Sequence, residues 1–281
     1  MITADAQRWR GRRASYRPAG EVIDPRRYEV APIASDAEAR AFVVAHHYSG
    51  SYPAARTRVG LYRGGDLVGV AVFSRPGQAR VLDALPCDAS AAVELGRFVL
   101  LDSVPGNGES WFLARALDHL RASGYEGIVT HADPEPRAAA DGRVVLPGHR
   151  GVIYQAASAV YTGRTRARTL WLLPSGEVYS EQAWSKLRRQ VRGWRYALDQ
   201  LVAAGAAPWD GTEPTAAWAL RELHRIGRPF RHRGNHRYLI PLSRACRRAL
   251  PGHLAAVGLQ VQPYPRAAAL PPAPAPIARA A

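Results

Sequence analysis

Strand-like and helix-like segments alternate between residues 31 and 178, and this alternation constrains the fold more than any other feature of the chain. The earliest example is a β-hairpin, because two apolar segments flank the turn sequence Gly64-Gly65-Asp66. A capping box formed by Ser35 and Glu38 marks the start of the first helix. We expect strands at residues 58–62, 67–73, 93–101, 127–131 and 168–173, and helices at residues 36–47, 110–123 and 152–161. This order predicts an α/β (α+β) domain with a mixed central sheet.

Basic residues are distributed unevenly along the chain, whose formal net charge is +15. Residues 31–178 hold 15 basic and 14 acidic side chains, whereas residues 179–238 hold 11 basic and 5 acidic ones. The first segment is therefore nearly neutral, and the second carries much of the excess charge. Residues 180–203 and 214–226 have helical patterns, which predicts a basic helical insert. Its arginines suit phosphate, because a guanidinium group binds phosphate oxygens in a bidentate manner.

Shifts in composition divide the chain into five parts. They are a basic N-terminal arm (1–30), a globular core (31–178), the basic helical insert (179–235), a returning strand with the C-terminal part of the core (236–262), and a flexible Pro/Ala tail (263–281). No run of eighteen apolar residues is present, and the polar N-terminus lacks a following apolar segment, so we expect neither a membrane span nor a secretory signal. We expect a soluble, cytoplasmic protein. Two cysteines are too few for a disulfide frame or a cysteine zinc cage.

Three motifs place side chains capable of chemistry at the ends of predicted elements. His46-His47-Tyr48 lies at the exit of the first helix, where at most one of the adjacent histidines is expected to share a pocket with Tyr48. Asp133 follows a predicted internal strand, and open α/β sheets bind ligands at the carboxyl ends of their strands. Gly148-His149-Arg150-Gly151 allows close backbone approach before a helix that projects Tyr154. The alternatives are a surface or core histidine, a turn-forming aspartate and a core tyrosine.

A fourth group of polar residues surrounds the strand at 93–101. Glu94 and Arg97 interrupt its apolar pattern, and burying such charges is unfavourable unless they pair or have a function. Taken alone, the pattern favours a structural Glu94–Arg97 pair. Asn107 and Ser110 are typical helix-capping residues, and the free amides of that helix N-terminus could also hold an anion. No Walker loop, nucleophile elbow, zincin motif or Rossmann fingerprint is present, so hydrolase, NTPase and dehydrogenase interpretations lose their usual support.

Six short blocks occur in a characteristic order. They are His-His-Tyr-Ser-Gly (46–50), Glu-Leu-Gly-Arg-Phe-Val-Leu (94–100), Asn-Gly-Glu-Ser-Trp-Phe-Leu (107–113), Thr-His-Ala-Asp-Pro (130–134), Gly-His-Arg-Gly-Val-Ile-Tyr-Gln-Ala (148–156) and Tyr-Thr-Gly (161–163). Each block alone is weak, but the ordered set resembles the Mom family of bacteriophage DNA-modification proteins. The resemblance covers residues 31–178 and the strand near 236–238. It implies a fold similar to the GCN5-related N-acetyltransferases (GNAT), with residues 31–178 as the catalytic core.

This resemblance also implies a reaction and its cofactors. The implied enzyme converts adenine in double-stranded DNA to its N6-carbamoylmethyl derivative, which protects phage DNA from restriction in the host cytoplasm. Bound iron is implied, with His47, Tyr48, Asp133 and Tyr154 as its ligands and, together with Ser110, as catalytic residues. Imidazole, carboxylate and phenolate donors suit iron. A donor such as acetyl-CoA, or a related compound, is expected at the turn formed by Asn107, Gly108, Glu109 and Ser110.

An enzyme that acts on adenine N6 must flip the base into an apolar or aromatic pocket, for which Tyr48, Trp111 and Tyr154 are candidates. The basic insert would then position the duplex. The residues expected to contact phosphate are Lys186, Arg188, Arg189, Arg192 and Arg195. A solvated helix face is the alternative for them. Two other functions stay open, which are an acetyl-CoA-dependent N-acetyltransferase acting on a small molecule or protein, and a non-enzymatic DNA-binding protein.

Overall fold

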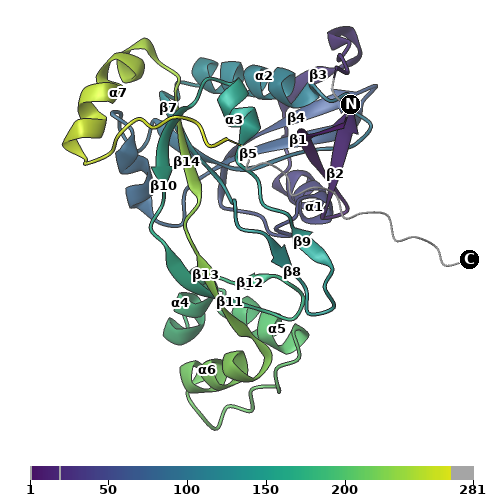
Figure 1. Ribbon diagram of the computed structural model, residues 1–281, viewed down its shortest axis with the longest axis vertical. Helices are drawn as coiled ribbons and strands as arrows, with labels where there is room; N and C mark the ends of the chain where they lie inside the picture. Colours follow the sequence, from purple (N-terminus) through teal and green to yellow (C-terminus); the bar gives the residue numbers. More distant parts are fainter. Residues whose placement is uncertain (1, 19, 267–281) are drawn as a thin grey trace, which may run out of the picture.

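The computed structural model describes residues 2–18 and 20–266 of the chain (Figure 1). Its elements, in chain order, are β1 (Ile2–Arg10), β2 (Arg13–Pro18), the 3-10 helix η1 (Pro25–Arg27), β3 (Glu29–Pro32), α1 (Asp36–His46), β4 (Ala55–Arg63), β5 (Asp66–Ser74), the 3-10 helix η2 (Ala79–Ala84), β6 (Ala92–Leu100), α2 (Gly108–Ala122), β7 (Gly127–Ala132), β8 (Arg137–Ala138), β9 (Val144–Leu146), α3 (Val152–Ala156), β10 (Val160–Arg164), β11 (Arg168–Leu172), β12 (Val178–Tyr179), α4 (Glu181–Arg189), α5 (Arg195–Ala203), α6 (Thr215–Ile226), β13 (Arg228–His232), β14 (His236–Pro241) and α7 (Arg244–Ala256).

Seven strands form the central sheet, in the order β10-β14-β7-β6-β5-β4-β3. Only β6 and β7 run parallel, and every other neighbouring pair in this sheet is antiparallel, so the expected mixed α/β architecture is confirmed. The parallel pairing begins at Ala92 and Gly127 and ends at Leu95 and Thr130. Beyond that point β6 continues to Leu100 beside β5 alone. The two parallel strands therefore separate near the middle of the sheet.

Helices cover both faces of this sheet. Successive residues of a strand point to opposite faces, so β5 contributes Ala71 and Phe73 to one core cluster and Val70 and Val72 to another. The first cluster packs against α2, and the second packs against α1. A third cluster holds α7 against the face that includes Val129 of β7. Packing in these layers therefore fixes the positions of the end of α1 and the start of α2 relative to the gap between β6 and β7.

A second, smaller lobe extends away from the central sheet and lies at the bottom of Figure 1. It consists of the three-stranded sheet β12-β11-β13 and helices α4, α5 and α6. Leu187, Leu201 and Trp218 are buried in a core cluster of its own. The expected helical insert is therefore accompanied by strands, and it begins at Arg168, before residue 179.

Two expected helices differ from the observed ones. The helix expected over residues 180–203 is interrupted between α4 and α5, because Gln190 and Gly193 adopt left-handed backbone conformations, with φ of 47° and 79°. The helix expected over residues 152–161 ends at Ala156. Ser158 turns the chain with φ of 55°, and Val160 then begins a strand that pairs with β14. Pairing in the sheet thus prevails over the local helical pattern.

The N-terminal hairpin and the segment that follows α7, up to residue 266, pack more closely on the core than their composition indicates. The expected N-terminal arm contains the hairpin of β1 and β2, whose Trp9 is buried. The segment after α7 returns to the sheet, where Tyr264 donates a hydrogen bond to the backbone oxygen of Ala159 (2.9 Å). The remainder of the expected tail, residues 267–281, lies outside the described residues. Among the described residues, no helix has the length and apolar character needed to cross a bilayer.

Candidate active site

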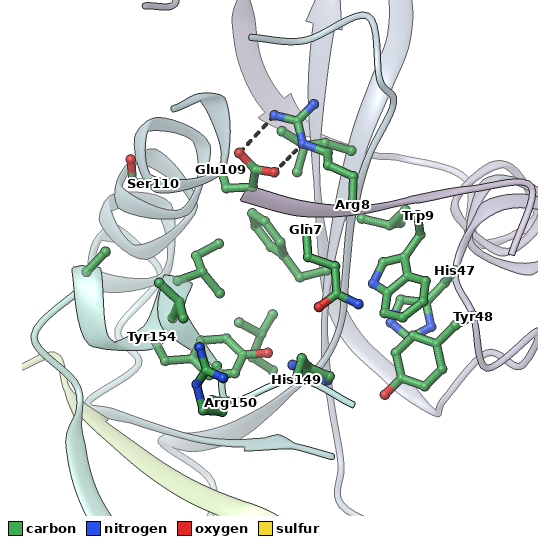
Figure 2. A pocket seen from close by; sticks show the side chains of 18 of the residues that line it. Gln7, Arg8, Trp9, His47, Tyr48, Glu109, Ser110, His149, Arg150 and Tyr154 are labelled. Atoms are coloured by element: carbon green, nitrogen blue, oxygen red, sulfur yellow. Dashed lines mark hydrogen bonds and ion pairs between the residues drawn. The ribbon is translucent and has the colours of Figure 1, made fainter. Parts of the chain in front are cut away.

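A cavity of about 430 Å³ lies where β6 and β7 separate (Figure 2). Six parts of the chain form its walls, namely the N-terminal hairpin, the end of α1, strand β6, the start of α2, strand β7, and the segment that leads into and includes α3. Its lining residues are Gln7, Arg8, Trp9, Tyr16, His47, Tyr48, Leu95, Gly96, Phe98, Val99, Leu100, Gly106, Glu109, Ser110, His131, Pro147, Gly148, His149, Arg150, Gly151, Val152, Ile153, Tyr154 and Ala156.

Three aromatic rings form one wall of this cavity. The Trp9 and Tyr48 ring centroids are 4.4 Å apart, and those of His47 and Tyr48 are 4.3 Å apart. The chain leaves α1 at His47, whose Nδ1 is 2.9 Å from the hydroxyl of Ser49. His46 instead packs against Phe42, outside the cavity lining. The exit from α1 therefore separates the adjacent histidines, and His47 is the one that shares the cavity with Tyr48.

The titratable side chains of this wall are uncharged at neutral pH. Burial lowers the pKa of His47 well below its ordinary value, and the nearby charge of Arg97 lowers it further. Burial also raises the pKa of Tyr48 to about 12. His149, opposite Tyr48, has a pKa lowered by burial to about 4. The cavity thus presents neutral imidazoles and phenols to a ligand.

Tyr154 lies on the other side of the cavity, where α3 begins (Figure 2). Gly151 precedes it with φ of 73°, and a Cβ atom there would lie 2.7 Å from the Tyr154 ring. A Cβ atom on Gly148 would lie 2.5 Å from the backbone oxygen of Pro134. Both glycines therefore allow the close backbone approach expected from their motif. Burial raises the pKa of Tyr154, and a hydrogen bond with Thr130 opposes that rise.

Glu94 and His131 form a pair that sequence reasoning missed. Glu94 Oε1 lies 3.0 Å from His131 Nδ1, and His131 lines the cavity. Parallel register places Leu95 of β6 beside Thr130 of β7, which brings the preceding and following side chains within reach. The favoured pairing of Glu94 with Arg97 is not observed, because the Arg97 guanidinium donates to the Ser51 hydroxyl (2.7 Å) and backbone oxygen (2.9 Å).

Asp133 lies outside the cavity lining and is saturated with protein partners. Its Oδ2 accepts from Arg137 (2.7 Å), and its Oδ1 accepts from His232 (3.0 Å) and from the amide of Glu135 (3.0 Å). Burial alone would raise the pKa of Asp133, but these partners lower it to about 2. Because His232 belongs to β13, Asp133 connects the central sheet to the second lobe.

This arrangement does not fit the iron site implied by the resemblance. His47, Tyr48 and Tyr154 line the cavity, but Asp133 does not. Within residues 2–18 and 20–266, no three side chains of His, Cys, Asp or Glu gather in a manner that could hold a metal ion. We therefore derive no role for iron.

The turn before α2 is occupied by the protein's own groups. Arg8 is 2% exposed, and its guanidinium donates to the backbone oxygens of Leu101 (2.7 Å), Val104 (2.6 Å) and Pro105 (2.7 Å) and pairs with the carboxylate of Glu109. The positive charge of Arg8 thus compensates the carboxylate of Glu109, and its guanidinium satisfies the three carbonyls of this turn.

The four residues expected to bind a donor at this turn have different roles. Glu109 and Ser110 line the cavity, and the Ser110 hydroxyl donates to the backbone oxygen of Asn107 (3.0 Å). Asn107 instead accepts a hydrogen bond from the amide of Ile23 (2.7 Å). Gly108 is buried against Val104. Asn107 and Gly108 therefore hold the turn together rather than line the cavity.

The residues expected to contact phosphate lie on α4, on α5 and between them. Arg188, Arg189, Arg192 and Arg195 are exposed, and none of them forms an ion pair within the described part of the chain. Arg195 lies over the ring of Trp194, with its guanidinium carbon 5.1 Å from the ring centroid. Lys186 is half-buried, with its Nζ 5.2 Å from the ring centroid of Tyr196. The second lobe thus presents a group of cations that no carboxylate neutralises.

Comparison with known families identifies the chain. The model of the Mom protein family matches residues 27–266, which is most of the sequence. The chain belongs to the Mom family. Its matched region includes every residue singled out by the sequence motifs, but it begins after the hairpin of β1 and β2. Gln7, Arg8, Trp9 and Tyr16 of the cavity therefore precede the region that the Mom family model covers.

Comparison with solved structures found chains of low similarity. A tandem GNAT protein from the clavulanic acid biosynthesis pathway, solved without AcCoA, shares 9% identity and a TM-score of 0.41, over 77% of this chain and 99% of that one. Eis1 from Mycobacterium abscessus shares 17% identity and a TM-score of 0.32, over 81% of this chain and 62% of that one. A search of curated proteins found no match.

The remaining sequence expectations for this Mom-family cavity concern its aromatic lining. Tyr48 and Tyr154 line it as expected, whereas Trp111 of α2 packs against the core and lies outside the lining. Gln7, Trp9 and His149 were missed as cavity residues. His149 lay within one of the sequence motifs. No sequence signal connects residues 7–9 with the other main parts of the lining, which begin more than 30 residues later in the chain.

Proposed function

We propose that this Mom-family protein is a DNA-modifying transferase that attaches a carbamoylmethyl group to N6 of adenine in double-stranded DNA. The observation that carries the proposal is the combination of an aromatic-walled cavity between β6 and β7 with a separate cationic lobe. The first provides space for one base, and the second provides sites for the phosphate backbone. Membership of the Mom family supports this division of labour.

The cavity suits a base that has left the duplex. Adenine N6 lies inside a base pair, so an enzyme that modifies it must extrude the nucleotide and stack the base in a pocket. Trp9, Tyr48 and Tyr154 supply aromatic surface on two sides of the cavity. Their neutral phenol and indole groups can also donate hydrogen bonds to ring nitrogens. This environment compensates for the stacking that the base loses on leaving the duplex.

The Glu94–His131 pair is positioned to accept a proton. When His131 donates its Nδ1 proton to Glu94, its Nε2 is an acceptor, and the carboxylate stabilises the imidazolium that then forms. His131 lines the cavity, and Glu94 is its partner outside the lining, so His131 is the member of the pair that a ligand in the cavity can meet. In the proposed reaction the N6 lone pair forms a bond to the methylene carbon of a carbamoylmethyl donor. The donor's leaving group departs with the bonding electrons, and one N6 proton passes to His131.

The donor in this proposal places its reactive part in the cavity, beside the turn before α2 where Arg8 and Glu109 form an ion pair. Only a donor whose reactive part fits a cavity of about 430 Å³ together with a base satisfies the geometry. Its chemical class is an activated acetamide, with a leaving group on the methylene carbon.

The second lobe holds the duplex in this proposal. Four exposed arginines that form no ion pair with any of residues 2–18 and 20–266 lie on α4, on α5 and between them. Each can neutralise one phosphate and release its condensed counterions, which makes binding strongly dependent on salt. Such contacts position the duplex without reading its sequence.

Nucleoside mass spectrometry of DNA from cells that express the protein tests the proposal. We expect a deoxyadenosine whose mass is increased by a carbamoylmethyl group in place of one hydrogen. Unmodified deoxyadenosine would contradict the proposed reaction. An acetylated small molecule or protein in the same cells would favour an N-acetyltransferase, and DNA binding without any modified base would favour a non-enzymatic DNA-binding protein.

A further inference from the structure

Gln7 carries a buried hydrogen-bond donor that faces the cavity. Its amide nitrogen has no partner among residues 2–18 and 20–266. Buried donors are almost always paired, because an unpaired one loses its hydrogen bonds to water without replacement. Figure 2 shows the amide group pointing into the cavity, toward the space between Trp9 and Tyr154. The side chain is therefore oriented to bind a ligand rather than another part of the fold.

Strand β1 fixes this orientation. Successive residues of a strand point in opposite directions, so Gln7 and Trp9 face the cavity while Arg8 points away from them (Figure 2). Arg8 is tied to Glu109 and to three backbone oxygens of the turn before α2. Arg8 and Trp9, the two residues that follow Gln7, are thus fixed by ion pairing and packing, which holds the backbone that carries Gln7 in place before a ligand arrives.

The surroundings of this amide fit a planar, nitrogen-rich ring. The Trp9 ring lies beside Gln7 and is 8% exposed, with the Tyr48 ring against it. A ring that stacks on this wall would present its edge to the amide. The carboxamide offers one donor and one acceptor side by side, and the matching edge of adenine is N7 beside the N6 amino group.

We propose that Gln7 determines the specificity of the cavity for adenine, donating to N7 and accepting from the N6 amino group. The inference rests on the proposed function, in which adenine of DNA enters this cavity. A 6-oxo purine such as hypoxanthine has a carbonyl in place of the amino group. It therefore loses one hydrogen bond, and its carbonyl oxygen faces the side-chain oxygen of Gln7, which is also an acceptor. Gln7 thereby selects the base that bears the reactive amine, and its acceptor orients that amine.

Binding of single-stranded oligonucleotides to the full-length protein tests this inference. The probes are two fluorescent oligothymidylates that carry a single central adenine or a single central hypoxanthine. We expect the wild-type protein to bind the adenine probe about tenfold more tightly in fluorescence anisotropy, which corresponds to one bidentate contact. In Gln7→Leu this preference should be lost. Arg10→Ala, in the same strand and outside the cavity lining, is the matched control and should retain it.

The outcomes separate this inference from the proposed chemistry. Equal binding of both probes by the wild-type protein, or a preserved preference in Gln7→Leu with an unchanged melting temperature, would overturn the role of Gln7. A wild-type preference that vanishes in Gln7→Leu would support it, even if DNA from expressing cells holds no modified base. In that last case the proposed transfer reaction would be wrong, while adenine recognition by Gln7 would stand.

Discussion

Two acidic residues near the cavity, Glu94 and Asp133, differ in the side chains with which they pair. Glu94 pairs with His131, which lines the cavity, whereas Asp133 bridges Arg137 and His232, and neither carboxylate is itself part of the lining. Sequence patterns alone favoured the reverse, because Asp133 follows a strand and Glu94 had a nearby arginine. The partners of a carboxylate depend on which strands become neighbours, and that information is not local.

The role of the Glu94–His131 pair can be tested by removing its ability to accept a proton. We expect Glu94→Gln and His131→Asn to reduce DNA modification about 100-fold or more, in the range typical of a lost general base. The measurement is the fraction of modified deoxyadenosine by nucleoside mass spectrometry. Asp118→Asn, an exposed carboxylate on α2, is the control, and full activity in both pair variants would exclude the proposed role.

The buried Arg8–Glu109 ion pair should matter for stability. Arg8→Ala leaves the Glu109 carboxylate without its partner at a position that is 17% exposed, so we expect the free energy of unfolding to fall by about 3 kcal/mol. The double variant Arg8→Ala/Glu109→Ala should be more stable than Arg8→Ala alone, because no unpaired charge remains. Chemical denaturation measures both values. If the loss of unfolding free energy in the double variant equalled the sum of the losses in the two single variants, the two side chains would not stabilise each other.

His236 should contribute to a loss of stability in acid. Burial and the charges of Arg164 and His149 lower its folded-state pKa to about 4, from an ordinary value near 6.5. Between these values the unfolded chain binds a proton that the folded chain does not, so stability is retained above pH 6.5 and falls as the pH decreases toward 4. The loss is on the order of 2 kcal/mol. His236→Asn should show a shallower decline of melting temperature over this range, and an unchanged slope would contradict the assignment.

At the scale of elements, periodicity predicts much of the central sheet and its covering helices. Strands β4 to β7 and helices α1 and α2 lie where alternation, capping and glycine turns place them. The hairpin of β1 and β2 was missed, because its polar, arginine-rich strands lack an apolar alternation. Its turn uses left-handed conformations at Gly11 and Arg12, with φ of 51° and 67°.

The cavity was harder to predict than the elements around it. Sequence motifs placed His47, Tyr48 and Tyr154 correctly as possible neighbours, because each lies at the end of a predicted element. Gln7 and Trp9 could not be predicted, since their position depends on Arg8 reaching a turn about 100 residues further along the chain. Long-range ion pairs of this kind leave no periodic signal in the sequence.

Helices α4 and α5 should determine how binding to DNA depends on salt. We expect replacement of Arg188, Arg189, Arg192 and Arg195 by glutamine to weaken duplex binding and to reduce the slope of log affinity against log salt by about 3 to 4 units. The control replaces the exposed arginines of α7, Arg244, Arg247 and Arg248, by glutamine. Titration of a fluorescent duplex at several salt concentrations measures the slope. The same slope in the α4–α5 variant and the wild-type protein would contradict the proposed contact.

For the whole molecule, the proposed function assigns DNA binding to the second lobe and the reaction to the cavity of the central sheet. The central sheet opens between β6 and β7 into a cavity with neutral rings, and the second lobe carries exposed arginines on a core of its own. Asp133 joins the two lobes through His232 of β13, which makes it a structural link between substrate binding and the cavity. In the proposed function, the net positive charge of the second lobe serves to hold DNA, and the aromatic cavity serves the reaction.

The most direct measurement of this division is nucleoside mass spectrometry on DNA from cells that express the wild-type protein, His131→Asn or the fourfold α4–α5 variant. We predict N6-carbamoylmethyl deoxyadenosine with the wild-type protein, a much lower amount with the fourfold variant, and nearly none with His131→Asn. Duplex binding by purified His131→Asn should equal that of the wild-type protein. Unmodified deoxyadenosine in DNA from cells that express the folded wild-type protein would contradict the account.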